Sequence, residues 1–149
     1  MRTKFYFSLF VAFIIIIVNY YANYYQVYWL FPWFDIPMHI SGGFMVALFA
    51  QTGIDHLLKT GVCVHIVDYI KLNKRRIIWT LLSVVAVGVF WEFVEWFLGV
   101  TDGLGPISRL DTIKDVFDDI IGGVLGVWFW NSLFNKKYTK INDKQQSEQ

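Results

Sequence analysis

Four long apolar stretches dominate this chain of 149 residues, and each is about long enough to cross a lipid bilayer as a helix. Hydrophobic residues make up 56% of the sequence, which exceeds the usual share in a soluble domain. We therefore predict an all-α, polytopic membrane protein whose residues 1–149 form a single membrane domain. The predicted transmembrane helices are 5–21, 36–58, 77–100 and 111–134, followed by a tail over 135–149.

Lysine and arginine predict how the helices are oriented, because loops rich in these residues stay on the cytoplasmic side. Two lie before the first helix, none in 21–35, five in 59–76, two in the third loop region and four in the tail. Both termini and the middle loop are therefore expected to be cytoplasmic, in the cytoplasmic membrane of a bacterial cell. The first apolar stretch lacks a small-residue cleavage site, so we interpret it as a retained helix rather than a signal peptide.

Two segments outside the four helices have the composition of membrane interfaces. Residues 20–34 are rich in tyrosine, tryptophan and phenylalanine, which predicts an aromatic belt at the outer surface, partly as a flat helix before Pro32. Apolar residues at helical spacing in 62–74 predict an amphipathic helix on the cytoplasmic surface. The net charge of +1 gives no reason to expect nucleic acid, and the lone Cys63 excludes an internal disulfide.

Ionisable side chains recur at one end of three of the predicted helices. An aspartate at a helix centre in hydrocarbon costs roughly 2.5–3.5 kcal/mol, so such residues usually have a function. In the predicted orientation they all lie in the outer half of the membrane and could meet in one outward-facing pocket. The residues are Asp35 and His39 in the second helix, Glu92 and Glu95 in the third, and Asp111, Asp115, Asp118 and Asp119 in the fourth.

Helical spacing places glycine next to each ionisable group on the same helix face. Gly42 and Gly43 follow His39, Gly88 precedes Glu92, and Gly122 and Gly126 follow the aspartates of the fourth helix. Glycine lets helices approach closely in lipid. Close packing at the glycines would hold the carboxylates near one another.

The residue types predict a metal site beside an acid–base pair. Asp35, His39, Asp115 and Asp118 are the candidate ligands of a divalent cation. Imidazole with carboxylate suits Zn²⁺, Mn²⁺ or Fe²⁺, whereas carboxylates alone suit Mg²⁺ or Ca²⁺. Glu92 and Glu95 share a helix face and repel unless a proton, cation or basic side chain lies between them, so they are the candidate general acid and base, or else metal ligands.

Structural roles compete with these assignments. Asp111 and Asp115 could cap the start of the fourth helix, because carboxylates suit a helix N-terminus. Asp119 could pair with Arg109 or Lys114. The same basic residues could neutralise the two glutamates, and His39 could simply make a hydrogen bond at the membrane edge.

The ordered motifs Asp35-x-x-x-His39, Glu92-x-x-Glu95-Trp96 and Asp111-Thr-x-x-Asp115-Val-x-Asp118 resemble the small YjdF-like bacterial inner-membrane proteins. The chain resembles the VanZ-like family more distantly, in six positions of that family's motif. These matches are Asp35, His39, Glu92, Asp115, Gly122 and Gly126, whereas Glu95 replaces a glutamine and Asp119 an asparagine. The resemblance implies a bacterial polytopic membrane protein and covers the second to fourth helices.

Three functions fit these features. The first is a metal-dependent enzyme that acts at the outer leaflet on a lipid-linked or phosphate-containing envelope substrate. The second is a non-catalytic membrane protein that binds an envelope precursor or a partner protein. The third is a cation or proton pathway, which the scarcity of polar residues deeper in the helices disfavours.

Overall fold

The computed structural model describes residues 2–60, 73–98 and 106–135, and this part of the chain is helical throughout apart from Tyr25, Gln26 and Phe31. Its long helices are α1 (Arg2–Tyr24), α3 (Asp35–Thr60), α5 (Asn73–Leu98) and α6 (Pro106–Trp130). The short elements are α2 (Val27–Leu30), the 3₁₀ turn η1 (Pro32–Phe34) and the π-helical turn η2 (Asn131–Asn135). The all-α prediction is therefore confirmed. The predicted surface helix over 62–72 and the tail beyond residue 135 lie outside the described residues.

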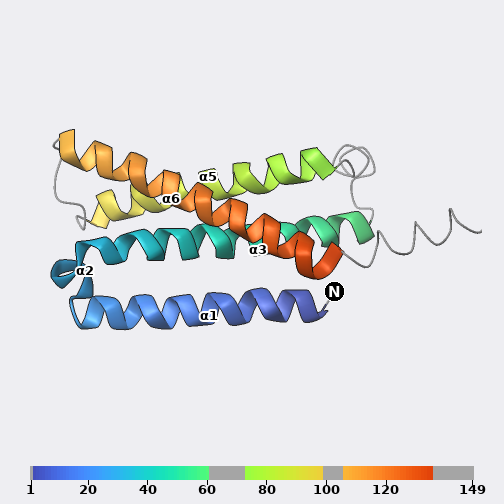
Figure 1. The fold of residues 1–149 in the computed structure, drawn as a ribbon, viewed down its shortest axis with the longest axis horizontal. Helices are drawn as coiled ribbons and strands as arrows, with labels where there is room; N and C mark the ends of the chain where they lie inside the picture. The colour runs from blue at the N-terminus through green and yellow to red at the C-terminus, as the bar shows by residue number, and fades with distance from the viewer. Residues whose placement is uncertain (1, 61–72, 99–105, 136–149) are drawn as a thin grey trace, which may run out of the picture.

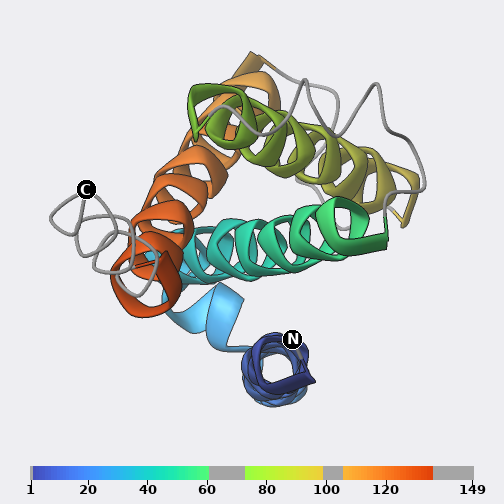
Figure 2. The ribbon, with the colours of Figure 1, turned by 90° about the vertical axis from the view of Figure 1, so that its right-hand side faces the viewer.

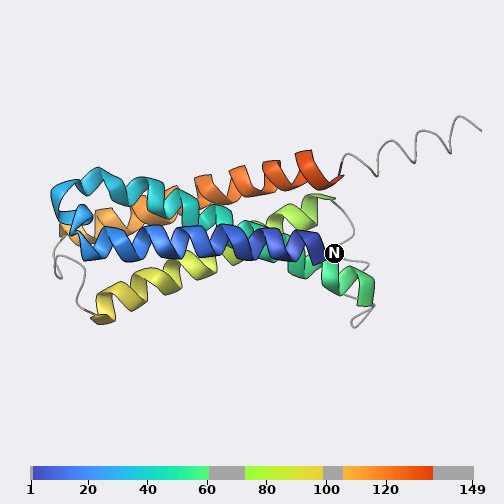
Figure 3. The same cartoon turned by 90° about the horizontal axis from the view of Figure 1, so that it is seen from below.

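The long helices run roughly side by side, so that the bundle has two ends (Figure 1). The start of α3, the end of α5 and the start of α6 lie at one end, and the N-terminus lies at the other (Figure 1). Viewed end-on, α3, α5 and α6 form three sides of a triangle, and α1 stands outside it next to α3 (Figure 2). Seen from below the view of Figure 1, α1 lies in front of the other helices along their length (Figure 3).

Three of the long helices are long and apolar enough to cross a membrane: Arg2–Tyr24, Pro32–Leu58 and Arg75–Phe97. They correspond to the first three predicted spans. Helix α6 is of similar length, but it carries six charged residues within 106–119. Its pairing with α3 is the most extensive contact between helices. The fourth predicted span therefore coincides with a helix that carries charged residues in its first half, of which Asp115, Asp118 and Asp119 are buried.

Glycine brings α3 and α6 into backbone contact. A Cβ added at Gly43 would overlap the carbonyl group of Asp119, and one added at Gly122 would overlap the carbonyl oxygen of Ile40. One helical turn beyond Gly122, a Cβ at Gly126 would lie 2.7 Å from the Cβ of Ala47. The predicted close approach at Gly122 and Gly126 is therefore present, and it fixes α3 against α6 directly beside the acidic residues.

A polar network joins four helices at the end of the bundle that holds the N-terminus. The Lys4 ammonium of α1 lies 2.7 Å from Asp55 of α3, and Arg76 of α5 contacts the same carboxylate at 2.8 Å. Arg76 also donates to Gln51, and the Gln51 amide donates to Thr80 at 3.0 Å. Lys4 lies over the ring of Trp130, which is completely buried. This network pairs two cations with one carboxylate and connects α1 to the other helices.

The aromatic segment between α1 and α3 is folded into short helical turns. Gln26, with φ at 54°, lies in the left-handed region and reverses the chain after α1. Tyr24, Trp29 and Trp33 are exposed, with 69%, 78% and 63% of their surface accessible. Exposed aromatic rings at the end of a transmembrane helix suit the interface between lipid and water. The predicted helix before Pro32 corresponds to α2.

Candidate functional site

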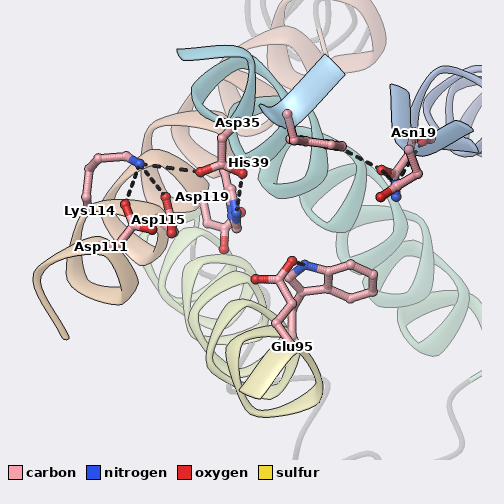
Figure 4. Close-up of polar contacts among 11 residues, drawn as sticks. Asn19, Asp35, His39, Glu95, Asp111, Lys114, Asp115 and Asp119 are labelled. Atoms are coloured by element: carbon pink, nitrogen blue, oxygen red, sulfur yellow. Dashed lines mark hydrogen bonds and ion pairs between the residues drawn. The ribbon is translucent and has the colours of Figure 1, made fainter. Parts of the chain in front are cut away.

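His39 lies at the centre of the ionisable residues, between α3 and α6. Its Nε2 is 3.4 Å from Oδ1 of Asp35, one turn earlier on α3. Its Nδ1 is 3.4 Å from Oδ1 of Asp119 on α6. The side chain of His39 is buried, with 7% of its surface exposed, as is that of Asp119. Figure 4 shows the imidazole held between the two carboxylates.

Lys114 of α6 lies among three carboxylates, next to Asp35 and Asp115 (Figure 4). Its Nζ is 2.9 Å from Asp115, 3.1 Å from Asp111 and 3.4 Å from Asp35. Asp115 is buried and Asp111 is exposed. Lys114 therefore ties the start of α3 to the start of α6, and it pairs with these aspartates rather than with Asp119 or the glutamates.

Helix α5 contributes Glu92 and Glu95. Glu92 is 7% exposed, and within the described residues its Oε1 has no hydrogen-bond partner. Glu95 is partly buried and accepts a hydrogen bond of 2.7 Å from the indole N–H of Trp91 on its own helix. Among the side chains that the structure describes, which do not include that of Arg109, no lysine or arginine forms an ion pair with either glutamate.

Two overlapping groups of side chains have the geometry to hold a metal ion. The first group is Asp35, His39 and Asp115, and the second is His39, Glu92 and Glu95. Within each group, one ligand atom per residue lies within 4.8 Å of the others. His39 belongs to both groups. We refer to these five residues, with Lys114 and Asp119, as the acidic cluster.

Five of the six candidate site residues predicted from the sequence are thus brought together at one end of the bundle. The exception is Asp118, which is buried but belongs to neither group. Its Oδ2 has no hydrogen-bond partner within the part of the chain that the structure describes. Asp111 lies at the edge of the cluster, where it contacts Lys114.

The sequence also allowed Asp119 to be an ion-pairing partner of Arg109 or Lys114 rather than a residue of the site. Asp119 lies one turn after Asp115, and its Oδ2 fills the space beside Gly88 of α5. Gly42 of α3 also faces this carboxylate, with a Cβ position 3.8 Å from Oδ1. The three glycines 42, 43 and 88 leave room for Asp119 where α3, α5 and α6 meet. The glycines that follow or precede the ionisable residues of α3 and α5 were the sequence feature that could have indicated this position of Asp119.

The negative charge of the cluster affects Tyr28, which lies outside the membrane-spanning segments. Tyr28 donates a hydrogen bond of 2.8 Å to the side-chain oxygen of Asn19. Burial raises the pKa of Tyr28 to about 12, and the charges of Asp35 and Glu95 act in the same direction. The phenol therefore remains a neutral hydrogen-bond donor at the edge of the site.

Apolar helices, with carboxylates and one imidazole buried between them at one end, define an integral membrane protein with a polar site built from α3, α5 and α6. The lipid bilayer is the environment of such helices. The chain matches DUF2238, a family described as predicted membrane proteins, over residues 1–136, and it belongs to this family. The comparisons with curated proteins and with solved structures gave no match.

Proposed function

We propose that the acidic cluster binds a divalent cation and that the protein is a metal-dependent enzyme acting on a lipid-linked or phosphate-containing envelope substrate. The observation that carries this proposal is the buried His39, which is shared by two groups of carboxylates. Glu92 adds a further ligand, because its buried Oε1 receives no hydrogen bond from any residue that the structure describes. A cation would satisfy that oxygen and offset the repulsion between the acidic side chains.

The residues also suit the proposed chemistry. A metal held by imidazole and carboxylates with open positions can bind a phosphate oxygen and activate water. Glu92 and Glu95 lie within reach of His39, and they would act either as general acid and base or as further ligands of the metal. Apolar side chains around the cluster would face the tail of a lipid substrate.

The proposed site faces outward in the cytoplasmic membrane, with α6 as the fourth span. The distribution of lysine and arginine supports this orientation, because the loop on the side of the acidic cluster between α1 and α3 has none. In a Cys63→Ser background, single cysteines at positions 73 and 103 test it with a membrane-impermeant thiol reagent. We expect labelling of intact cells at 103 only, and labelling at 73 alone would reverse the orientation.

Metal analysis tests the proposed cation site. Wild-type protein, purified in detergent and equilibrated with Mn²⁺ or Zn²⁺, should retain one metal ion per chain after desalting, and Glu92→Gln should lose it. Asp111→Asn is the matched control, because it removes a carboxylate that lies outside both groups. Absence of metal from the wild type, or equal loss in both variants, would contradict the proposal.

A non-catalytic role is the second candidate, and the VanZ-like resemblance and the exposed aromatic segment favour it. In that role the protein would bind an envelope precursor or a partner without turnover. A polyprenyl diphosphate incubated with the Mn²⁺-loaded protein separates the two roles. Release of inorganic phosphate that depends on Glu95 would support the enzyme, whereas saturable binding without release would support the binding protein.

A cation or proton pathway is a weaker third candidate. The acidic cluster and the network around Asp55 lie at opposite ends of the bundle (Figure 1). The hydrophobic residues Ala47, Leu48 and Val84 are fully or almost fully buried between the helices that join the two ends. A proton-flux assay in vesicles tests this role, and flux above that of empty vesicles would favour it.

A further inference from the structure

The two metal-competent groups differ in whether the protein already supplies a cation. In the first group, Asp35 and Asp115 both lie within 3.4 Å of the Lys114 ammonium, and Asp111 adds a third carboxylate. Lys114 therefore occupies the position between the start of α3 and the start of α6 where a metal would approach these oxygens (Figure 4).

In the second group, neither glutamate is ion-paired with a lysine or arginine whose side chain the structure describes. Glu95 receives only the neutral N–H of Trp91, and Glu92 keeps a buried oxygen without a hydrogen-bond donor. Both glutamates come from α5, one turn apart, and face His39. An oxygen with more than nine-tenths of its side chain buried and no partner is a costly arrangement unless a cation completes it.

We propose that Lys114 is a built-in cation that closes the Asp35–Asp115 position, so that a divalent ion binds at His39, Glu92 and Glu95. This inference rests on the proposed cation site and specifies which half of the acidic cluster is used. Like charges at close range repel, so an ion between Asp35 and Asp115 would first have to displace the ammonium. One imidazole nitrogen and two carboxylates suit Mn²⁺, Fe²⁺ or Zn²⁺ and leave coordination positions for water or a phosphate oxygen.

Counting bound Mn²⁺ in two variants tests the inference. We use desalted, detergent-purified full-length protein and measure the metal-to-protein ratio. In the wild type the ratio should be one, and in Lys114→Met it should rise to two, because the uncharged side chain opens the Asp35–Asp115 position. Lys114→Arg keeps the positive charge and should keep the ratio at one. An unchanged ratio of one in Lys114→Met overturns the inference and leaves the proposed cation site standing.

Two further variants locate the ion without changing Lys114. Glu92→Gln should lose the ion that the wild type binds, whereas Asp35→Asn should retain it. In the Lys114→Met background, Asp35→Asn should return the ratio from two to one. Loss of the ion in Asp35→Asn with native Lys114 would place it in the other half of the cluster and overturn the inference, even if Lys114→Met fails to fold.

The same measurements separate this inference from the proposed function. A ratio of zero in the wild type with one ion in Lys114→Met would uphold the role of Lys114 and contradict metal binding by the native protein. A ratio of zero in both would overturn both ideas. Each variant is compared with the wild type by size-exclusion chromatography and circular dichroism, so that unfolded protein is not counted.

Discussion

The carboxylate of Asp119 on α6 fills the space that a side chain at Gly88 of α5 would occupy. A Cβ at residue 88 would overlap Oδ2 and lie 3.3 Å from Cγ of Asp119. The other oxygen of the same carboxylate is 3.4 Å from His39. The three helices therefore meet around one acidic side chain, and the absence of a side chain on α5 keeps that carboxylate beside the imidazole.

This relationship predicts a non-additive pair of substitutions. Gly88→Ala should lower the free energy of unfolding by about 1–3 kcal/mol, because the added methyl overpacks a buried site. In an Asp119→Ala background the same change should cost less, since the overlapping carboxylate is gone. A double-mutant cycle measured by unfolding in detergent should give a coupling of about 0.5–3 kcal/mol. Equal costs in both backgrounds would show that Asp119 does not occupy this space.

The close contact between α3 and α6 predicts which glycine-to-alanine substitutions destabilise the protein most. Gly43→Ala and Gly122→Ala should destabilise the protein more than Gly88→Ala, because their methyl groups would meet backbone rather than the end of a side chain. Gly53 of α3 is the matched control, since no atom of a neighbouring segment lies within 4 Å of its Cβ position. Gly53→Ala should be neutral or stabilising by up to about 1 kcal/mol, as expected for a helical glycine. Thermal unfolding in detergent gives the comparison, and similar losses at residues 43 and 53 would refute the close crossing.

The network at the opposite end predicts a large effect for Asp55. Asp55→Asn leaves the Lys4 and Arg76 charges without their carboxylate, and all three side chains are at most 20% exposed. These side chains are part-buried, so the cost should approach but not reach about 3–5 kcal/mol, the cost of removing one partner of a buried ion pair. His56→Ala, at the next residue of α3 but on its exposed face, should have little effect. The Tm of both variants provides the test, and a similar small shift in each would mean that Asp55 is not a junction of the helices.

The raised pKa of Tyr28 predicts that the stability of the folded protein falls at alkaline pH. Its pKa is raised from 10.0 to about 12, so the folded state holds the phenol proton more tightly than the unfolded state. The contribution of Tyr28 to stability should therefore be complete below pH 10 and be lost as the pH rises toward about 12. The difference in tyrosinate absorbance between wild type and Tyr28→Phe measures the titration. A midpoint near 10 would show that the phenol is not shielded.

Tyr28→Phe also removes the hydrogen bond to Asn19. We expect a loss of about 1 kcal/mol at neutral pH, which is the usual net value for such a bond. Tyr24→Phe, on a side chain that is 69% exposed, is the matched control and should be neutral. Unfolding at neutral pH and between about pH 10 and 12 separates this loss from the titration.

Periodicity and hydropathy predicted the long helices because these properties belong to each segment alone. The predicted 36–58 corresponds to α3 (Asp35–Thr60), and the predicted 77–100 begins later than α5 (Asn73–Leu98). The difference arises because Asn73–Arg76 are polar but continue the helix, which lets Arg76 reach Asp55. An apolar window locates the part of a helix inside lipid and misses a polar first turn.

The pairing of charges could not be predicted in the same way, because it depends on how helices pack. The sequence offered Lys114 as a partner for Asp119 or the glutamates, whereas the structure places it with Asp35, Asp111 and Asp115. The convergence of Lys4 and Arg76 on Asp55 joins residues that are 51 and 21 positions apart and was not expected. Glycine spacing predicted the contact between α3 and α6, because the small residue itself permits it.

The ion pair between Lys4 and Asp55 has a consequence for the order in which the chain is made. Synthesis proceeds from the N-terminus, so Lys4 already exists when Asp55 emerges, whereas Arg76 follows 21 residues later. Lys4 of α1 and Asp55 of α3 can therefore form their ion pair before α5 has been synthesised. The acidic cluster differs, because Lys114 is made long after Asp35 and His39. The pair of Lys4 and Asp55 can therefore form during synthesis, whereas the acidic cluster gains the positive charge of Lys114 only once α6 has been made.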